Sequence, residues 1–413
     1  MSDLPAISVL IASHGRPALL VRALRFIAQS DHPALEVVVA ADAAGLGALA
    51  AAAFAGRIKT REVAVANIAV ARNAALGAAA GGIVAFIDDD AVPEPGWARA
   101  LALAFADPRR VAAGGRVRRR GGWEDEAPPV AVDARGADHT LGRWSDVAAG
   151  TLPAPAPGMV AKLQGTNCAF RTEALRAAGG FDPAFAYFLD YADICRRLAP
   201  CGTIAFVPGA EVQHERAAGP HRGPDRAPRD LYEVGASLAV FLRRHAQPAD
   251  HAAEHAAARA AFVAEQRRRL LRHMIAGRLG PEEVARLMRR LGQGLAAGAA
   301  RALAPLGPLP DAAPPFLPFG DTGPRPGRIL RAPLLGGAAT RDAALQAREA
   351  GQIVTVIGRR AGLGGVRIGC DASGVWHHRL AFRAGRAALA AEAARIAALR
   401  PPDPTAADPL GPG

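Results

Sequence analysis

Along the first hundred residues, short apolar runs alternate with longer stretches in which apolar residues recur every three or four positions. The short runs fit buried strands, and the longer stretches fit helices, one of which begins at Pro17 with Leu20, Leu24 and Ile27 on one face. The predicted strands span residues 6–13, 35–42, 59–65 and 82–87, and a second helix spans residues 67–81. Strands that are apolar throughout and separated by helices predict an α/β fold with a mostly parallel sheet covered on both faces.

The pattern is irregular between residues 98 and 160 and regular again beyond them. The later elements that it predicts are a strand followed by a helix at 172–178, a helix at 187–198, two strands within 203–214, helices within 229–245 and 255–300, further strand-like pieces, and an Ala-rich helix at 383–399. We therefore expect four parts: an α/β domain over 1–225, a helical extension over 226–304, a flexible or extended Pro/Gly-rich linker over 305–326, and a small α+β region over 327–413.

Polar side chains gather where the predicted strands end. They are Ser13, His14, Asp42, Asp88, Asp89 and Asp90. Because ligands of such sheets bind beyond the carboxyl ends of the strands, these side chains should converge on one rim. Adjacent aspartates repel one another unless a cation or a well-hydrated loop compensates their charge. An Asp-x-Asp pair suits a hard divalent cation that also holds a diphosphate, although aspartate clusters also cap loops without binding anything.

Five motifs in order are more specific than the acidic triplet alone. They read ISVLIASHGRP, EVVVAAD, NIAVARNAALGAAAGGIVAFIDDDAVPEPGW, GTNCAFRTEALRAAGGFD, and FLDYADICRRL followed by VPGAEVQH. With this order and spacing, over about residues 6–216, the sequence resembles the family 2 glycosyltransferases, which have the GT-A fold. The resemblance implies a Rossmann-like sheet flanked by helices and does not extend beyond about residue 250.

The resemblance also implies roles for individual residues. Asp90 and His214 fall where a metal ion, Mn²⁺ or Mg²⁺, is held, although a histidine that is merely hydrogen-bonded at a strand end is the alternative for His214. His14 stands where a tyrosine usually lies beside the nucleotide base, and Asp42 where an acid reads the base edge. The residues in nucleotide-sugar-binding positions are Ser13, His14, Asp42, Arg72, Asp88, Asp89, Gly165, Thr166 and Asn167.

The second acidic motif departs from the family pattern. Members usually carry two adjacent acids there, whereas the sequence LDYAD places Tyr191 at one of these positions. Asp190 or Asp193 is then left to act as the general base. Since residues three apart share a face of a helix, both could reach the same cleft, and we favour Asp190. A chain whose catalysis is impaired by Tyr191 is the alternative.

These parts predict a metal-dependent glycosyltransferase, of the hexosyltransferase type, that moves a sugar from a nucleotide-diphosphate sugar to an acceptor hydroxyl. A carboxylate takes the hydroxyl proton, the cation stabilises the leaving diphosphate, and a single displacement inverts the anomeric centre. The acceptor would be a glycan or a lipid-linked group, as in polysaccharide or glycolipid synthesis. Three other classes are alternatives: a nucleotidylyltransferase, whose Gly-rich phosphate loop is missing; an inactive nucleotide-sugar-binding or assembly module; and an electrostatic surface adaptor.

Composition adds a basic surface to this picture. The formal net charge of +12 derives largely from arginine, which fits either binding of anionic lipid head groups or phosphates or a merely solvated, compositionally biased surface, and no nucleic-acid-binding pattern accompanies it. The four cysteines show no pairing pattern, and no stretch reaches the roughly 20 strongly apolar residues of a membrane span. We expect a cytoplasmic protein that does not bind nucleic acid, with a peripheral location at the inner face of the membrane left open.

Overall fold

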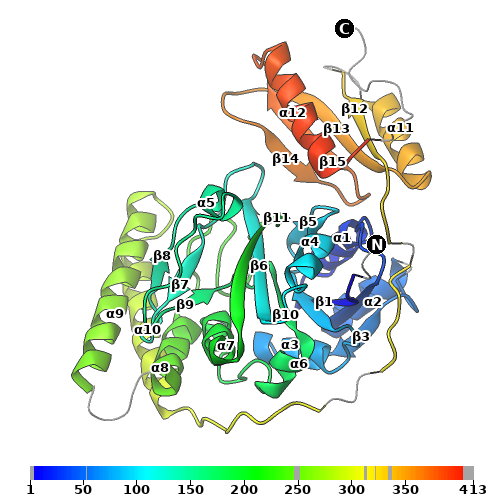
Figure 1. The fold of residues 1–413 in the computed structure, drawn as a ribbon. Helices are drawn as coiled ribbons and strands as arrows, with labels where there is room; N and C mark the ends of the chain where they lie inside the picture. Colours follow the sequence, from blue (N-terminus) through cyan, green and yellow to red (C-terminus); the bar gives the residue numbers. More distant parts are fainter. Residues whose placement is uncertain are drawn as a thin grey trace.

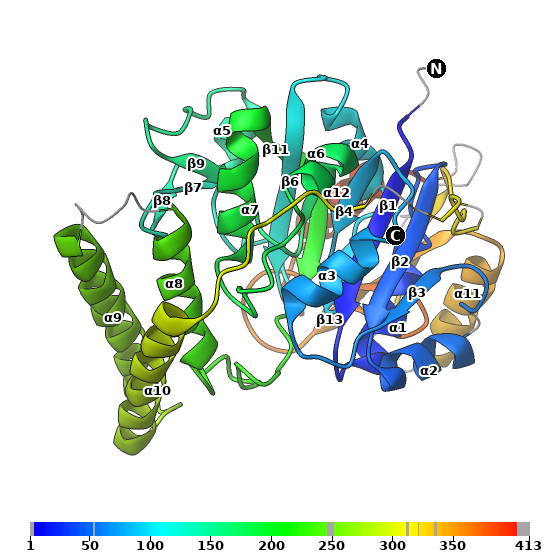
Figure 2. The same cartoon turned by 90° about the horizontal axis from the view of Figure 1, so that it is seen from below.

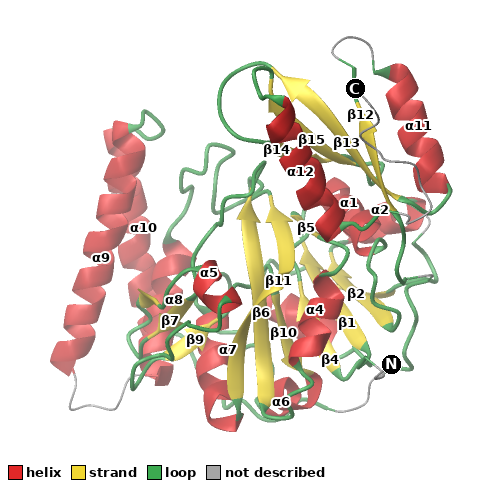
Figure 3. Ribbon diagram, turned by 45° about the horizontal axis from the view of Figure 1, so that its top comes forward, coloured by secondary structure: helices red, strands yellow, loops and turns green. Residues whose placement is uncertain are grey.

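The chain folds around one large mixed sheet with helices on both faces, and two smaller groups of elements pack beside it (Figure 1, Figure 3). The computed structural model describes residues 4–52, 54–245, 252–310, 314–320, 322–333 and 337–402. In spatial order, the strands of the large sheet are β3 (Lys59–Glu62), β2 (Leu35–Ala41), β1 (Ile7–Ser13), β4 (Ile83–Phe86), β10 (Cys168–Arg171), β6 (Arg110–Arg119), β11 (Thr203–His214) and β5 (Ala91–Pro93).

The first half of this sheet is parallel, as predicted. β1 lies between β2 and β4, and β3 continues the sheet beyond β2, all in parallel register. The second half is mixed, because β10 runs antiparallel to β4 and β6, and β5 runs antiparallel to β11. β6, which pairs in parallel with β11, lies in the stretch where the sequence pattern is irregular. The pairing of β5 with β11 brings His214 level with Ala91, the residue after Asp90.

Two hydrophobic cores sandwich the sheet. Alternate residues of the strands, such as Val9 and Leu10 of β1, face opposite cores, which explains why the strands are apolar throughout. The helices on the Val9 side are α1 (Pro17–Ile27), α2 (Ala43–Ala51) and α4 (Trp97–Ala104), and those on the Leu10 side are α3 (Ile68–Leu76), α6 (Thr172–Ala177) and α7 (Asp190–Leu198).

Several predicted elements differ in extent from the structure. The helix predicted over 67–81 is α3, which ends at Leu76, and the strand predicted over 59–65 is β3, which ends at Glu62. The helix expected from residue 187 begins only at Asp190, because Leu189 adopts a left-handed conformation with φ 63° that a helix cannot continue through. Residues 203–214 form the single strand β11, with an irregular register between Val207 and Glu211, and not two strands. A short 3₁₀ helix, Ala199–Cys201, joins α7 to β11.

A helical region packs against one side of the sheet domain. Its three helices are α8 (Tyr232–His245), α9 (Ala252–Ile275) and α10 (Pro281–Ala300), which share a third hydrophobic core. α8 and α10 cross closely because Gly298 lies at the contact, where a β-carbon would come within 2.2 Å of the backbone oxygen of Ala236. The neighbouring small elements are the antiparallel strands β8 (Asp138–Thr140), β7 (Val130–Val132) and β9 (Val160–Lys162) and the helix α5 (Trp144–Ala148).

The Pro- and Gly-rich stretch after α10 is extended and packed. Its described residues run along the sheet domain from the helical region to the C-terminal strands (Figure 1, Figure 2). The backbone N–H groups of Leu309 and Phe319 donate to the carbonyls of Arg176 and Leu35, each at 2.9 Å. The fully buried Phe319 ring also stacks on Phe54.

Residues 327–402 form a second sheet, which we call the C-terminal α/β region. Its strands, in spatial order, are β12 (Gly327–Arg331), β13 (Ile353–Arg360), β15 (Trp376–Ala381) and β14 (Arg367–Cys370), and its helices are α11 (Ala338–Glu349) and α12 (Arg386–Leu399). The region packs against α1 and β5 of the sheet domain (Figure 1). Among the helices of the described residues, none has the length and apolar content of a membrane span.

Candidate active site

A cavity of about 530 Å³ opens at the carboxyl ends of β1 and β4, beside the start of α7. The loops after β1 and β4 supply part of its polar side chains, as in other sheets of this type, and α3, α7 and β11 supply Arg72, Asp190 and His214. Of the thirteen residues that the sequence singles out, ten line the cavity: Ser13, His14, Arg72, Asp88, Asp89, Asp90, Gly165, Thr166, Asp190 and His214. Asp42, Asn167 and Asp193 do not.

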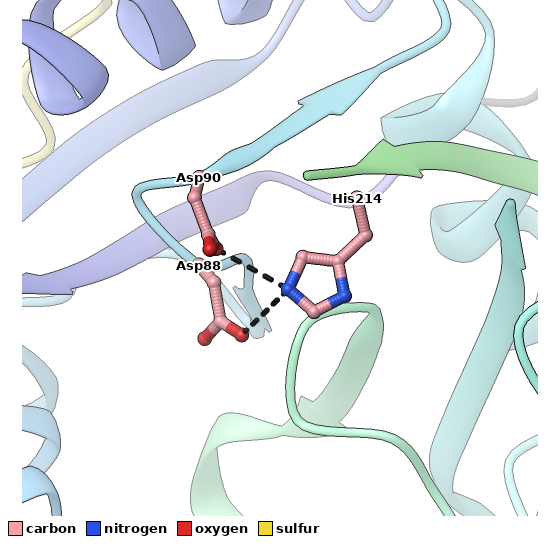
Figure 4. A group of neighbouring side chains, drawn as sticks. All are labelled: Asp88, Asp90 and His214. Atoms are coloured by element: carbon pink, nitrogen blue, oxygen red, sulfur yellow. Dashed lines mark ion pairs between the residues drawn. The ribbon is translucent and has the colours of Figure 1, made fainter. Parts of the chain in front are cut away.

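Asp88, Asp90 and His214 form a candidate metal site in this cavity. Each offers one ligand atom, and these atoms all lie within 4.8 Å of one another (Figure 4). His214 Nε2 lies 3.3 Å from Asp90 Oδ1 and 3.9 Å from Asp88 Oδ2. Asp90 and His214 are buried, whereas the Asp88 side chain is 34% exposed, so the group opens toward the cavity. Two carboxylates and an imidazole fit a divalent cation such as Mn²⁺ and leave positions free for phosphate oxygens.

Glu126 orients His214 from the side opposite to the aspartates. Its Oε2 lies 2.9 Å from His214 Nδ1, so Nε2 faces Asp90. Burial alone would lower the pKa of His214, but the hydrogen bonds with Asp90 and Glu126 outweigh burial and raise this pKa to about 10. Against the effect of burial, the same contact lowers the pKa of Asp90 to about 2. Without a metal ion, a protonated imidazole therefore balances the charge of the aspartates.

Asp89, the middle acid of the triplet, faces other partners. It accepts hydrogen bonds from Ser13 Oγ at 2.7 Å and from Arg16 Nη1 at 3.0 Å. Burial raises the pKa of Asp89 to about 6, although Arg16 opposes the shift. These bonds tie the loop after β1 to the loop after β4, which gives Asp89 a role in holding the two loops together.

Arg72 links the candidate metal site to Asp190. Its guanidinium donates to the Asp190 carboxylate and lies 3.9 Å from an oxygen of Asp88. Asp190 is the first residue of α7, and the left-handed Leu189 before it is a strained conformation of the kind that clusters at functional sites. Burial raises the pKa of Asp190, although the charge of Arg72 opposes this shift. The carboxylate therefore binds a proton more readily than that of a solvent-exposed aspartate.

Tyr191 belongs to an aromatic cluster beneath Arg72. Its ring contacts Phe170 and Phe181, and Arg72 Cζ lies 4.4 Å from the ring centroid, a cation–π contact. Gly165 makes room for this ring, because a β-carbon there would lie 2.2 Å from it. Burial raises the pKa of Tyr191 well above its usual range, so its hydroxyl cannot act as a base near neutral pH.

Asp193, the second candidate base, has partners outside the cavity. Its fully buried carboxylate pairs with Arg197 Nη2 at 2.6 Å and with His245 Nε2 at 2.8 Å. Both acids belong to α7, but Asp190 is its first residue and lies beside the cavity, whereas Asp193, almost one turn further along, faces α8. The helical spacing led us to expect that both acids reach the same cleft. This expectation is wrong, because Asp190 lines the cavity and Asp193 does not.

Asp42 and Asn167 also act at a distance from the cavity. Asp42 caps α2 by accepting from Gly45 N at 2.8 Å, and it accepts from Gly15 N at 2.7 Å, which fixes the loop that carries His14. Asn167 is fully buried and accepts from Trp97 Nε1 at 2.8 Å. Sequence position alone cannot separate such loop-holding side chains from those that face a ligand.

Several residues of the cavity lie outside the sequence prediction. Arg16 stands two residues after His14, and its place after the first strand could have revealed it, whereas Glu126 lies in the irregular stretch with no signal. Tyr187 and His221 stack with ring centroids 3.8 Å apart on the cavity wall. Two further lining residues, which the sequence presents as ordinary surface arginines, are Arg216 and Arg222.

One family model matches the part of the chain that carries the acidic triplet. Residues 8–177 match the model described as glycosyl transferase family 2. This part of the chain is a family 2 glycosyltransferase domain. The match takes in β1 and the acidic triplet, and the mixed sheet flanked by helices has the GT-A fold. The matched range ends before α7 and before β11, the strand that carries His214.

Solved glycosyltransferase structures are distant from this one. The mannosyltransferase PcManGT from Pyrobaculum calidifontis, in complex with GDP-Man and Mn²⁺, is 19% identical over 72% of this chain and 88% of its own, with a TM-score of 0.41. GalNAc-T7 with UDP, GalNAc and Mn²⁺ is 16% identical over 62% and 54%, with a TM-score of 0.44. TarS of S. aureus is 16% identical over 60% and 41%, with a TM-score of 0.40. A comparison with curated proteins found no match.

Proposed function

We propose that this glycosyltransferase transfers a sugar from a nucleotide-diphosphate sugar to an acceptor hydroxyl, with Mn²⁺ or Mg²⁺ and with inversion at the anomeric carbon. The observation that carries the proposal is the placement of Asp88, Asp90 and His214 in the same cavity as Asp190. Asp88, Asp90 and His214 would hold the ion, and the ion would supply positive charge to the diphosphate that leaves. Ser13, His14, Gly165 and Thr166 line the same cavity and are proposed to contact the donor.

Asp190 is proposed as the general base. A sugar hydroxyl is a poor nucleophile near neutral pH and must lose its proton as it attacks the anomeric carbon. The buried Asp190 carboxylate lies in the cavity across Arg72 from Asp88, so a sugar between the two would have its base and its leaving group on opposite sides. One displacement in that geometry inverts the anomeric centre. Arg72 is proposed to hold both carboxylates in place.

The acceptor is proposed to be a glycan or a lipid-linked group that reaches the cavity past α9 and α10. Arg278, between these helices, donates to the backbone oxygen of Asp225, close to the cavity-lining segment 219–222. Arg268 and Arg272 are exposed on α9 nearby. Exposed arginines at this place favour an anionic membrane surface, and co-sedimentation with phosphatidylserine vesicles, compared with phosphatidylcholine vesicles, tests this contact.

Donor hydrolysis tests the proposal before the acceptor is known. The full chain is incubated with UDP-, GDP- and dTDP-sugars and Mn²⁺ in the absence of acceptor. We expect slow release of one nucleoside diphosphate, and we expect EDTA to abolish it. Binding of a nucleotide sugar without any turnover would instead support an inactive binding module, a second candidate that Tyr191 motivates because it stands where an acid is usual. Failure of every donor to bind would contradict both functions.

A further inference from the structure

The contact between the C-terminal α/β region and the sheet domain is buried and specific. The fully buried Trp376 packs edge-on against Phe26 of α1, with ring centroids 4.9 Å apart, and its Nε1 donates to Gln29 Oε1 at 3.0 Å. Val92 of β5 lies in the same hydrophobic cluster, together with Ile353. Because Val92 is two residues from Asp90, this core reaches the segment that carries the metal-site aspartates.

A buried ion pair anchors the end of that segment. Arg400 donates two parallel hydrogen bonds to Glu94, from Nε at 3.0 Å and from Nη2 at 2.8 Å, and both side chains are at most 2% exposed. On the C-terminal side, Arg400 is held by Thr355 Oγ1 at 2.8 Å and lies over the Trp376 ring at 3.7 Å. On the other side, Glu94 N donates to Glu211 O of β11 at 3.0 Å. A bidentate pair of this kind fixes the relative orientation of the two side chains as well as the distance between them.

A second contact holds the loop that carries Glu126. Trp123, at the turn after β6, donates through Nε1 to Glu392 of α12 at 3.0 Å, and Arg395 Cζ lies 4.9 Å from its ring centroid. The loop returns along β6, where Glu126 N donates to Val117 O at 2.8 Å. Glu126 then reaches His214, so α12 is connected to the imidazole through one short hairpin.

We infer that the C-terminal α/β region is a positioning element of the metal site, with Arg400 fixing the Asp88–Glu94 segment and Trp123 fixing the Glu126 hairpin. The inference rests on the proposed metal site. Neither Arg400 nor Glu392 lines the cavity, so both act through other residues. Partners behind the ligands orient them and tune metal affinity, and the two contacts end on the two segments that carry or orient all three ligands.

Mn²⁺ binding to the full chain, measured by titration calorimetry without any nucleotide, tests the inference. We expect Arg400→Gln to weaken Mn²⁺ affinity by about 10- to 100-fold. We expect Arg400→Lys, which keeps the charge but loses the bidentate pair, to fall between Arg400→Gln and the native chain. Hydrogen–deuterium exchange should rise in residues 88–94 and 211–217 of the Arg400→Gln protein.

Arg359→Gln is the matched control. Arg359 also belongs to the C-terminal α/β region, but its bonds run to the backbone of Ala381 and Ala384 within that region. A merely structural role for Arg400 would make the two variants alike, whereas we expect Arg359→Gln to leave Mn²⁺ affinity and exchange at the metal site unchanged.

The other outcomes also decide. A folded Arg400→Gln protein with native Mn²⁺ affinity and native exchange overturns the inference. Should Arg400→Gln not fold, Trp123→Phe takes its place, since it keeps an aromatic side chain and removes the N–H donor to Glu392. Native Mn²⁺ affinity and native exchange in the Trp123→Phe protein overturn the inference as well. If the native chain binds no Mn²⁺ in the absence of nucleotide, the exchange data alone decide whether the contacts hold the two segments, and the donor-hydrolysis experiment decides the proposed function.

Discussion

The three consecutive aspartates divide between two tasks. Asp88 and Asp90 face His214, whereas Asp89 faces Ser13 and Arg16, whose guanidinium also lies 3.6 Å from Asp90. Asp89 and Asp90 lie in a turn that the hydrogen bond from Ala91 N to Asp88 O closes at 3.1 Å, and this turn separates the middle acid from its neighbours. The repulsion expected of an acidic triplet is thereby relieved from two sides, by His214 beside Asp88 and Asp90 and by the Arg16 guanidinium beside Asp89 and Asp90.

Asp90→Asn and Asp89→Asn should separate these tasks. We expect Asp90→Asn to weaken Mn²⁺ binding by about 100-fold or more, because a ligand oxygen and its charge are lost. Asp89→Asn retains most of the affinity, because Asp89 holds loops and not the ion. Calorimetric titration with Mn²⁺ measures both variants, and equal losses in the two would contradict the division.

Asp190→Asn should spare binding and remove turnover. The amide fills the same space and still accepts a hydrogen bond from Arg72, but it cannot take a proton. We expect the rate of sugar transfer to fall by about 10²- to 10⁴-fold with little change in nucleotide-sugar affinity. Steady-state kinetics together with equilibrium binding check this, and normal turnover would rule out Asp190 as the base.

Asp193→Asn distinguishes the two acids of α7. Since its carboxylate is paired with Arg197 and His245 away from the cavity, the substitution should cost up to about 3 kcal/mol of unfolding free energy. Activity per folded molecule should survive. Chemical denaturation combined with activity measurements tests this, and loss of turnover in a fully stable Asp193→Asn protein would reverse the assignment.

At the scale of elements, the strands that pack by apolar side chains are the predictable ones. β1, β2 and β4 are buried on both faces, so their sequences are continuous apolar runs that can be recognised without the structure. β6 is equally central but reads RVAAGGRVRR, because its small residues let other groups approach: a β-carbon on Gly115 would lie 2.1 Å from Ala210 O. Its arginines pair with acids that are distant in sequence, such as Arg118 with Glu211. Long-range packing of this kind leaves no local signal.

Two glycines of α10 provide a matched test of helix packing. Gly298→Ala should destabilise the protein by about 1–3 kcal/mol, because the new methyl group would meet the Ala236 backbone. Gly292→Ala, on the same helix with nothing within 4 Å of its added β-carbon, should stabilise it by up to about 1 kcal/mol through helix propensity. Urea unfolding of both variants measures the signs, and the same sign for both would show that the α8–α10 crossing is looser than described.

At the scale of the whole molecule, a buried histidine makes the C-terminal α/β region sensitive to acid. His378 Nε2 accepts from Arg400 at 3.2 Å, which leaves the Nδ1–H to donate to Glu392 at 2.6 Å, so the ring is neutral. Burial, with Arg400 adding to it, lowers the pKa of His378 to about 4 against the opposing effect of Glu392. A proton on Nε2 would displace the Arg400 contact.

Acidification should therefore loosen this region. Since the unfolded chain has the higher pKa, it binds protons first, and the stability that neutral His378 contributes is complete above about pH 6.5 and is lost as the pH falls toward 4. The loss amounts to at most about 3 kcal/mol. Thermal unfolding between pH 7.5 and 4.5 should show a smaller fall in His378→Gln than in the native chain.

The contact of the C-terminal α/β region with the sheet domain also contains its own optical reporter. Trp376 is fully buried beneath Arg400, and Trp123 is partly buried at Glu392, whereas Trp97 and Trp144 are buried inside the sheet domain and its neighbouring elements. Separation of the two parts would expose the indoles of Trp376 and Trp123 to water and shift their fluorescence emission to longer wavelengths. Emission spectra without any added dye would then follow whether manganese or a sugar nucleotide draws the two parts together.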